Sequence, residues 1–94
     1  MYFDWDPAKA HANLRKNRVS FEMAVTVFDD PLHLSILDSA SATEERWVTI
    51  GLAADKQTLV VVHTYQTRSG AELLRIISAR LATKHERRQY EKGV

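Results

Sequence analysis

The sequence predicts a single α+β domain over residues 1–94, with two N-terminal helices, a four-stranded antiparallel meander sheet and a C-terminal helix. Three observations support this prediction. Apolar residues recur at helical spacing as far as Pro31, they then alternate with polar residues, and a helix-capping sequence begins at Thr83. A chain of 94 residues has room for one hydrophobic core, so we expect one domain.

Two helices are predicted before Pro31. The first covers residues 7–17, because Asp6 followed by Pro7 is typical of a helix start. The second begins after Ser20, whose side chain can cap it, and ends before Pro31, because proline disfavours helical backbone in the residue that precedes it. Its apolar residues follow the i, i+3, i+4, i+7 pattern of a core-facing helix: Phe21, Ala24, Val25 and Phe28.

Strands are predicted from alternation and from apolar runs, over residues 32–36, 46–52, 58–64 and 73–79. The third is apolar on both faces, which is typical of a central strand. The aromatic segment 2–5 is compatible with an edge strand, and the polar residues 38–43 form a loop. Ser69 and Gly70 indicate a turn, and if this is a two-residue hairpin loop, the register pairs Thr64 with Arg75 and His63 with Ile76.

The predicted closing helix is polar. Thr83 and Glu86 fit a capping box, and the helix then continues through charged residues with almost no apolar face. Burial in the core therefore cannot stabilise it. We expect it to lie on the surface, to meet a polar ligand or to bind a partner.

Composition excludes several classes of site. The chain has no cysteine, so disulfides, thiolate metal sites and cysteine nucleophiles are excluded. Its four histidines are scattered without ligand spacing, and we expect neither a metal nor another cofactor. The sequence contains no apolar run of transmembrane length and no visible leader, so a cytoplasmic location without membrane contact is expected.

Charge is unevenly distributed although the net charge is only +1. Residues 9–18 are basic without an acid, residues 29–55 carry six acids against Arg46, and residues 68–92 carry seven Lys or Arg against three Glu. If the two basic segments meet in the fold, they form a patch that suits a polyanion. Otherwise they are simply solvated faces.

Several motifs, in this order along nearly the whole chain, resemble the BrnT toxin family. They are Phe3-Asp4-Trp5-Asp6 with Lys9 and Asn13, Val19-Ser20-Phe21-Glu22 with Ala24, Val27-Phe28-Asp29-Asp30-Pro31, Glu45-Arg46 with Ile50-Gly51, Val60-Val61-Val62-His63-Thr64, and Arg75-Ile76-Ile77-Ser78-Ala79-Arg80 with Ala82, Thr83, Glu86, Arg87 and Tyr90.

The resemblance implies a RelE-like fold, with helices packed on one side of an antiparallel sheet. It implies a ribonuclease that stops translation. It also implies a cognate BrnA-like antitoxin with a ribbon-helix-helix domain, through which alone the complex binds promoter DNA.

The chain departs from the family in two places. Lys16-Asn17-Arg18 stands where the family usually has Lys-His-Gly, and Gln66 stands at a position that commonly holds arginine, the nearest being Arg68. These departures favour an alternative hypothesis, a catalytically decayed toxin fold that acts as antitoxin partner and co-repressor. A third hypothesis is an RNA-binding protein that never cleaves.

Metal-independent RNA cleavage uses the 2′-hydroxyl of the substrate as the nucleophile. The enzyme must align the reacting groups, move a proton and stabilise the charge that develops on the phosphate. Histidine suits the proton transfer, and arginine suits the phosphate because its planar fork binds two oxygens. The predicted catalytic residues are His63, Arg68, Arg75 and Arg80.

The predicted substrate-binding residues are Lys9, Asn13, Lys16, Thr64, Arg87 and Tyr90. Most of these site residues have a structural alternative. His63 can be a core histidine, Tyr90 can dock the last helix on the sheet, and the first helix can present Lys9, Asn13 and Lys16 to solvent. Arg75 and Arg80 can form salt bridges with Glu44, Glu45 or Glu72. Trp5 and Trp47 are interpreted as core residues.

Overall fold

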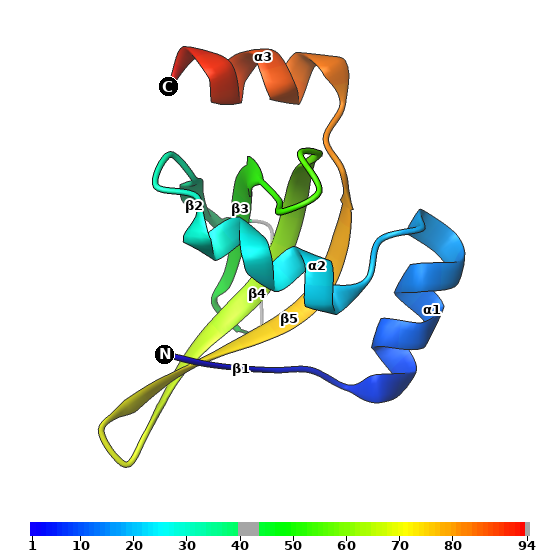
Figure 1. The fold of residues 1–94 in the computed structure, drawn as a ribbon. Coiled ribbons are helices and arrows are strands. Elements are labelled where there is room, and N and C mark those ends of the chain that lie inside the picture. The colour runs from blue at the N-terminus through cyan, green and yellow to red at the C-terminus, as the bar shows by residue number, and fades with distance from the viewer. Residues whose placement is uncertain (40–43, 94) are drawn as a thin grey trace.

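The computed structural model describes residues 1–39 and 44–93, which form one five-stranded mixed sheet and its helices (Figure 1). The sheet order is β1-β5-β4-β3-β2. The elements are β1 (Tyr2–Asp4), α1 (Pro7–Asn17), α2 (Phe21–Val25), the 3₁₀ helix η1 (Thr26–Asp29), β2 (Leu34–Asp38), β3 (Arg46–Leu52), β4 (Thr58–Arg68), β5 (Ala71–Leu81) and α3 (Lys84–Lys92). Among these described helices, none is both long and apolar enough to cross a membrane.

Strands β2 to β5 pair with successive neighbours in antiparallel fashion, which confirms the predicted meander. The prediction of a four-stranded, purely antiparallel sheet was wrong, because β1 adds a fifth strand and pairs in parallel with β5. Phe3 lies opposite Leu74 in this pairing and packs against the core, with its ring centroid 5.7 Å from that of Phe28. Burial of this aromatic ring favours the attachment of β1 at the edge.

The two N-terminal helices begin as predicted. The Asp6 side chain accepts a hydrogen bond from the N–H of Ala8, and the Ser20 side chain accepts one from Met23. The second helix is α-helical only as far as Val25 and continues as the 3₁₀ turn η1. α1 ends at Arg18, whose backbone is left-handed with φ 61°.

The described parts of the predicted loop 38–43 are Asp38, which belongs to β2, and Ser39; the rest lies outside the described residues. The hydrophobic core lies between the sheet and α1, α2 and η1, and its buried apolar residues are Val19, Phe21, Ala24, Val27, Ala53, Leu59, Val61, Leu74, Ile76 and Ala79. Gly51 in β3 allows η1 to approach closely, because a Cβ there would lie 2.7 Å from Val27 Cγ1.

A β-bulge in β5 determines which side chains share a face. The register passes from the pair Val62–Ser78 to the pair His63–Ile76, so Ile77 is the extra residue. Residues five apart on a regular strand point to opposite faces. Because of the bulge, however, Arg75 and Arg80 pair with Thr64 and Val60, which are four apart on β4 and share one face.

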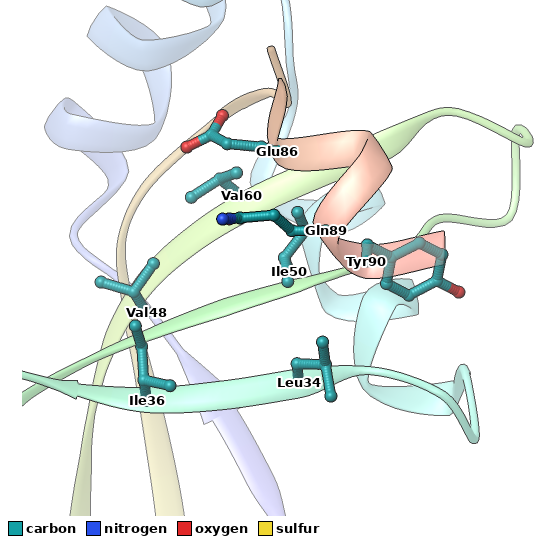
Figure 2. Close-up of a pocket in the computed structure, with 8 residues that line it drawn as sticks. All are labelled: Leu34, Ile36, Val48, Ile50, Val60, Glu86, Gln89 and Tyr90. Atoms are coloured by element: carbon teal, nitrogen blue, oxygen red, sulfur yellow. The ribbon is translucent and has the colours of Figure 1, made fainter. Parts of the chain in front are cut away.

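The sheet therefore has two distinct faces. The core face is covered by α1, α2 and η1 (Figure 1). It includes His63, whose ring lies against Phe28. The opposite side, here called the open face, includes Thr64, Arg75 and Arg80, and α3 lies across it over β2, β3 and β4 (Figure 2). Helices thus lie on both sides of the sheet, unlike the one-sided packing expected. α3 has too few apolar residues to join the core.

Candidate functional site

Four of the predicted site residues on β4 and β5 lie along the open face: Thr64, Arg68, Arg75 and Arg80. Thr64 and Arg68 alternate along β4, and Arg75 and Arg80 are brought to the same side by the bulge in β5. Arg68 is exposed near the tip of the β4–β5 hairpin, where it pairs with Ala71. The predicted hairpin register, which places Thr64 opposite Arg75 and His63 opposite Ile76, is confirmed.

Arg75 is held from one side only. Its Nη1 donates a hydrogen bond to Asp4 Oδ2 at 3.0 Å, and the two side chains remain 42% and 43% exposed. Its other N–H groups make no hydrogen bond to the residues that the structure describes. Arg75 can therefore bind an anion without giving up its partner.

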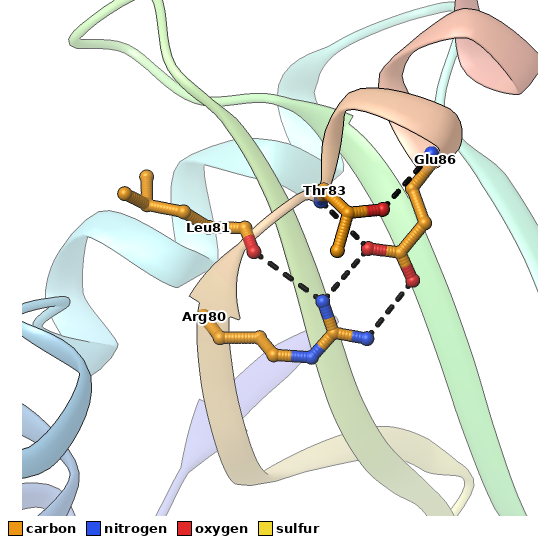
Figure 3. A network of polar contacts seen from close by, with 4 residues as sticks. All are labelled: Arg80, Leu81, Thr83 and Glu86. Atoms are coloured by element: carbon orange, nitrogen blue, oxygen red, sulfur yellow. Dashed lines mark hydrogen bonds and ion pairs between the residues drawn. The ribbon is translucent and has the colours of Figure 1, made fainter.

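Arg80 is held more completely (Figure 3). Its Nη1 and Nη2 donate to the two Glu86 carboxylate oxygens at 2.8 and 2.9 Å, and Nη1 also reaches the carbonyl oxygen of Leu81. Glu86 also accepts the Thr83 N–H in the predicted capping box, which is confirmed. The hydrogen bonds from Arg80 are the largest cause that lowers the pKa of Glu86 to about 2. This ion pair joins the end of β5 to the start of α3.

An apolar groove of about 150 Å³ lies between α3 and the open face of the sheet (Figure 2). The groove is lined by Leu34, Ile36, Val48, Ile50 and Val60 from the sheet and by Glu86, Gln89 and Tyr90 from α3. The Tyr90 hydroxyl donates a short hydrogen bond to Asp30, and burial together with this contact raises the pKa of Tyr90 to about 12. Tyr90 therefore docks α3 on the sheet, as its structural alternative predicts.

His63 lies in the core face and not in the site. Its side chain is fully buried between the rings of Phe28 and Tyr65, each with its centroid 5.0 Å away. Its Nε2 is 2.6 Å from the hydroxyl of Thr49, which in turn contacts Ser35. Burial is the main cause that lowers the pKa of His63 to about 4, and nearby His33 adds to it. This position is the one that the structural alternative, a core histidine, predicts.

The predicted contacts on α1 lie on the other side of the sheet. Asn13 is buried and fully engaged with backbone: it donates to the carbonyl oxygens of Val19 and Ala79 and accepts the N–H of Ala79. It therefore ties α1 to β5. Lys9 and Lys16 are exposed on the same helix. Arg87 is an exposed residue of α3.

Sequence reasoning missed Asp4. The edge strand that contains Asp4 was expected. Its pairing with Arg75 was not, because the two residues are 71 positions apart and sequence patterns reveal only contacts between nearby residues. Arg75 and Arg80 do form salt bridges, as their structural alternative predicted. Their partners are Asp4 and Glu86, however, and not the predicted Glu44, Glu45 or Glu72. Within the part of the chain that the structure describes, no group of three or more metal-ligating side chains occurs.

Comparisons with known proteins agree with the motifs. Residues 5–86 match the family described as "Ribonuclease toxin, BrnT, of type II toxin-antitoxin system". Among solved structures, the chain is similar to the crystal structure of the Brucella abortus ribonuclease toxin BrnT, with a TM-score of 0.57 and 22% sequence identity over 89% of this chain and 99% of that one. No match was found among curated proteins. The chain belongs to the BrnT family of ribonuclease toxins of type II toxin-antitoxin systems.

Proposed function

We propose that this chain is a cytoplasmic endoribonuclease that stops translation by cutting RNA without a metal. In this reaction the 2′-hydroxyl gives its proton to water and attacks the adjacent phosphate, and negative charge develops on the phosphate oxygens. The bond from phosphorus to the 5′-oxygen then breaks, which leaves a 2′,3′-cyclic phosphate and a 5′-hydroxyl protonated from water. The observation that carries the proposal is the alignment of Arg75, Arg80 and Thr64 on the open face by the β5 bulge. Arginines on one exposed face can hold a polyanion at several points.

The two arginines have different roles in this proposal. Five residues of strand span roughly 16 Å, so Arg75 and Arg80 contact different phosphates. Arg75 takes the reacting phosphate, because several of its N–H groups are free of partners among the described residues. Arg80, already paired with Glu86, contributes a weaker contact further along the strand. With His63 in the core, catalysis relies on positioning and charge stabilisation, which is consistent with a low turnover.

The proposed partner is a BrnA-like antitoxin with a ribbon-helix-helix domain. Such a partner silences the toxin by covering the open face and supplies the contact with promoter DNA. Exposed apolar surface at the groove supports the proposed partner, since Ile36, which lines the groove, is 67% exposed. A small domain that presents apolar surface gains stability when a partner buries it.

An alternative function is a decayed enzyme that serves only as antitoxin partner and co-repressor. The specific observation in its favour is that Asp4 and Glu86 neutralise Arg75 and Arg80, while His63 is buried. An enzyme that had lost its chemistry would keep the fold and the partner surface. Cleavage by the purified chain separates the two hypotheses.

The test is cleavage of single-stranded RNA by the purified chain and by Arg75→Ala, Arg80→Ala and Arg15→Ala. Removal of one group that stabilises transition-state charge costs on the order of 10²–10³-fold in rate, which we expect for Arg75→Ala. The expected loss is smaller for Arg80→Ala. Arg15 lies exposed on α1, so its variant controls for the loss of one positive charge and should cleave at the wild-type rate.

Two results would contradict the ribonuclease proposal. One is the absence of cleavage by the wild-type chain when its antitoxin complex still binds operator DNA, which is the behaviour of the decayed enzyme. The other is an equal loss of cleavage rate in the Arg15→Ala and Arg75→Ala variants. That result would mean that the rate depends on overall positive charge and not on a specific site. Strong operator binding by the isolated chain would contradict the proposed division of labour with the antitoxin.

A further inference from the structure

Three polar side chains from distant parts of the sequence lie in a row on the open face. Asp4 in β1 pairs with Arg75 in β5, and Arg75 pairs with Thr64 in β4. Neighbouring strands are about 4.8 Å apart, so the row spans about 10 Å. Because paired residues point to the same face of a sheet, the three side chains stand next to one another.

The two outer members of the row have unused hydrogen-bonding capacity. Thr64 is only 5% exposed, yet its hydroxyl oxygen makes no hydrogen bond to any described residue. Asp4 Oδ1 is also buried and has no partner in the described part of the chain. A buried polar atom without a partner destabilises a protein and therefore calls for an explanation. His63 Nδ1 is a third such atom among the described residues, but it is enclosed in the core, whereas Asp4 and Thr64 flank the partly exposed Arg75, where a ligand can complete the bonding.

The pairing within the row differs from a purely structural ion pair. Arg75 and Asp4 share a single hydrogen bond of 3.0 Å and are both more than two-fifths exposed. Arg80 and Glu86 in contrast share two hydrogen bonds, and Glu86 is further fixed by the helix cap. The Arg80 pair has little capacity left, whereas the Arg75 pair can accept a ligand on its exposed side.

The chemistry of the row matches a ribose phosphate. A phosphate only accepts hydrogen bonds, and Arg75 and Thr64 offer N–H and O–H donors. An ionised carboxylate only accepts, and Asp4 lies on the other side of Arg75. The 2′-hydroxyl of ribose can donate to such an acceptor, and deoxyribose lacks that group.

We infer that Asp4, Arg75 and Thr64 form a binding site for one ribose phosphate, in which Arg75 and Thr64 hold the phosphate and Asp4 accepts a hydrogen bond from the 2′-hydroxyl, so that the site prefers RNA to DNA. This inference rests on the proposed function and identifies the substrate class and the specificity-determining residue of the same site.

The test measures binding without cleavage. The probes are the 3′,5′-bisphosphates of the four ribonucleosides and of the corresponding 2′-deoxynucleosides, which contain no internucleotide bond. Dissociation constants are determined by NMR titration for the wild type, Asp4→Ala, Asp4→Asn, Arg75→Ala and Asp29→Asn. Asp29 is an exposed acid in η1, on the core side of the sheet, and its variant matches the change of charge in Asp4→Asn.

The wild type should bind the ribose form about tenfold more tightly than the deoxyribose form, the effect of one hydrogen bond to a charged group. Asp4→Ala should remove this preference and keep the binding of the deoxyribose form. Asp4→Asn preserves the shape of the side chain and should reduce the preference at least threefold, whereas Asp29→Asn should retain it. Arg75→Ala should weaken the binding of both forms.

The inference is overturned if the wild type binds both forms equally or if Asp4→Ala retains the preference. It is also overturned if Asp4→Ala weakens both forms to the same extent, because Asp4 would then only position Arg75. A ribose preference that depends on Asp4, in a chain that cuts no RNA, would uphold this inference and reject the ribonuclease proposal, so the two failures are distinguishable.

Discussion

Polar side chains have different roles on the two faces of the sheet. On the core face, Asn13 and Thr49 are buried and hydrogen-bonded within the chain, and His63 is enclosed by aromatic rings. On the open face, Arg75 keeps free N–H groups and Thr64 keeps an unpaired hydroxyl, so far as the described residues show. Neighbours in sequence can thus belong to separate tasks: His63 contributes to folding and Thr64 to the proposed binding site.

The sharpest test of this comparison changes one residue on each face. His63→Ala should lower the free energy of unfolding by about 2–4 kcal/mol, because it leaves a cavity and removes the partner of Thr49. Arg75→Ala should lower it by less than about 1 kcal/mol, as for an exposed ion pair. Urea denaturation measures both. If His63→Ala folds stably but no longer cleaves RNA, His63 takes part in the reaction, which would contradict the separation of roles between the two faces.

A second test uses pH to act on the core face. The pKa of His63 is lowered from its ordinary value of 6.5 to about 4, so the unfolded chain takes up the proton more readily than the folded one. The stability that neutral His63 provides should be complete above pH 6.5 and decline toward pH 4, by about 3 kcal/mol at most. Urea denaturation at pH 7 and pH 4.5 measures the decline. A His63→Phe variant should lose less stability over this range, and an equal loss would assign the effect to other groups.

A third test examines how α3 is held on the open face. Tyr90→Phe removes the hydrogen bond to Asp30 and should lower the free energy of unfolding by about 1–2 kcal/mol. Amide hydrogen exchange should become faster in α3, while the strands of the core keep their protection. Arg88→Ala, at an exposed position of the same helix, is the control and should change neither quantity. Unchanged exchange in Tyr90→Phe would mean that the groove contacts suffice to dock α3.

The smallest expected effect concerns the C-terminal end of α1, on the core side of the sheet. Arg18 has a left-handed backbone with φ 61°, a conformation in which a side chain is strained and glycine is favoured. Arg18→Gly should raise the free energy of unfolding by roughly 0.5–1 kcal/mol. Arg18→Ala keeps the strain and should give no gain, so a gain in both variants would assign the effect to the lost charge.

Local signals predicted most of the elements but not all of the site. The switch in periodicity at Pro31, the caps at Ser20 and Thr83 and the turn at Ser69–Gly70 each act over a few residues and can be recognised in the sequence. The hairpin turn even predicted that Thr64 faces Arg75. Between the turn and the bulge, that register determines which side chains reach the open face, because a shift of one residue would exchange the faces of a strand.

The remaining features depend on contacts between distant residues. No residue type marks the bulge at Ile77, although it alone brings Arg80 to the same face as Arg75. The parallel pairing of β1 with β5 joins segments that are far apart in the sequence. The sequence therefore did not predict that Asp4 lies beside Arg75. Burial of His63 likewise depends on Phe28 and Tyr65, which pack on it from different elements.

The parallel pairing of β1 with β5 has a consequence for synthesis of the toxin. Asp4 meets Arg75 only after the 71 residues that follow Asp4, up to and including Arg75, have been made and β5 has joined the sheet. At 5–20 residues per second this interval lasts roughly 4–14 s, during which the growing chain lacks the proposed site. The row of Asp4, Arg75 and Thr64 therefore forms late in synthesis, and a ribonuclease activity that depends on it, as proposed, would begin only after the row is complete.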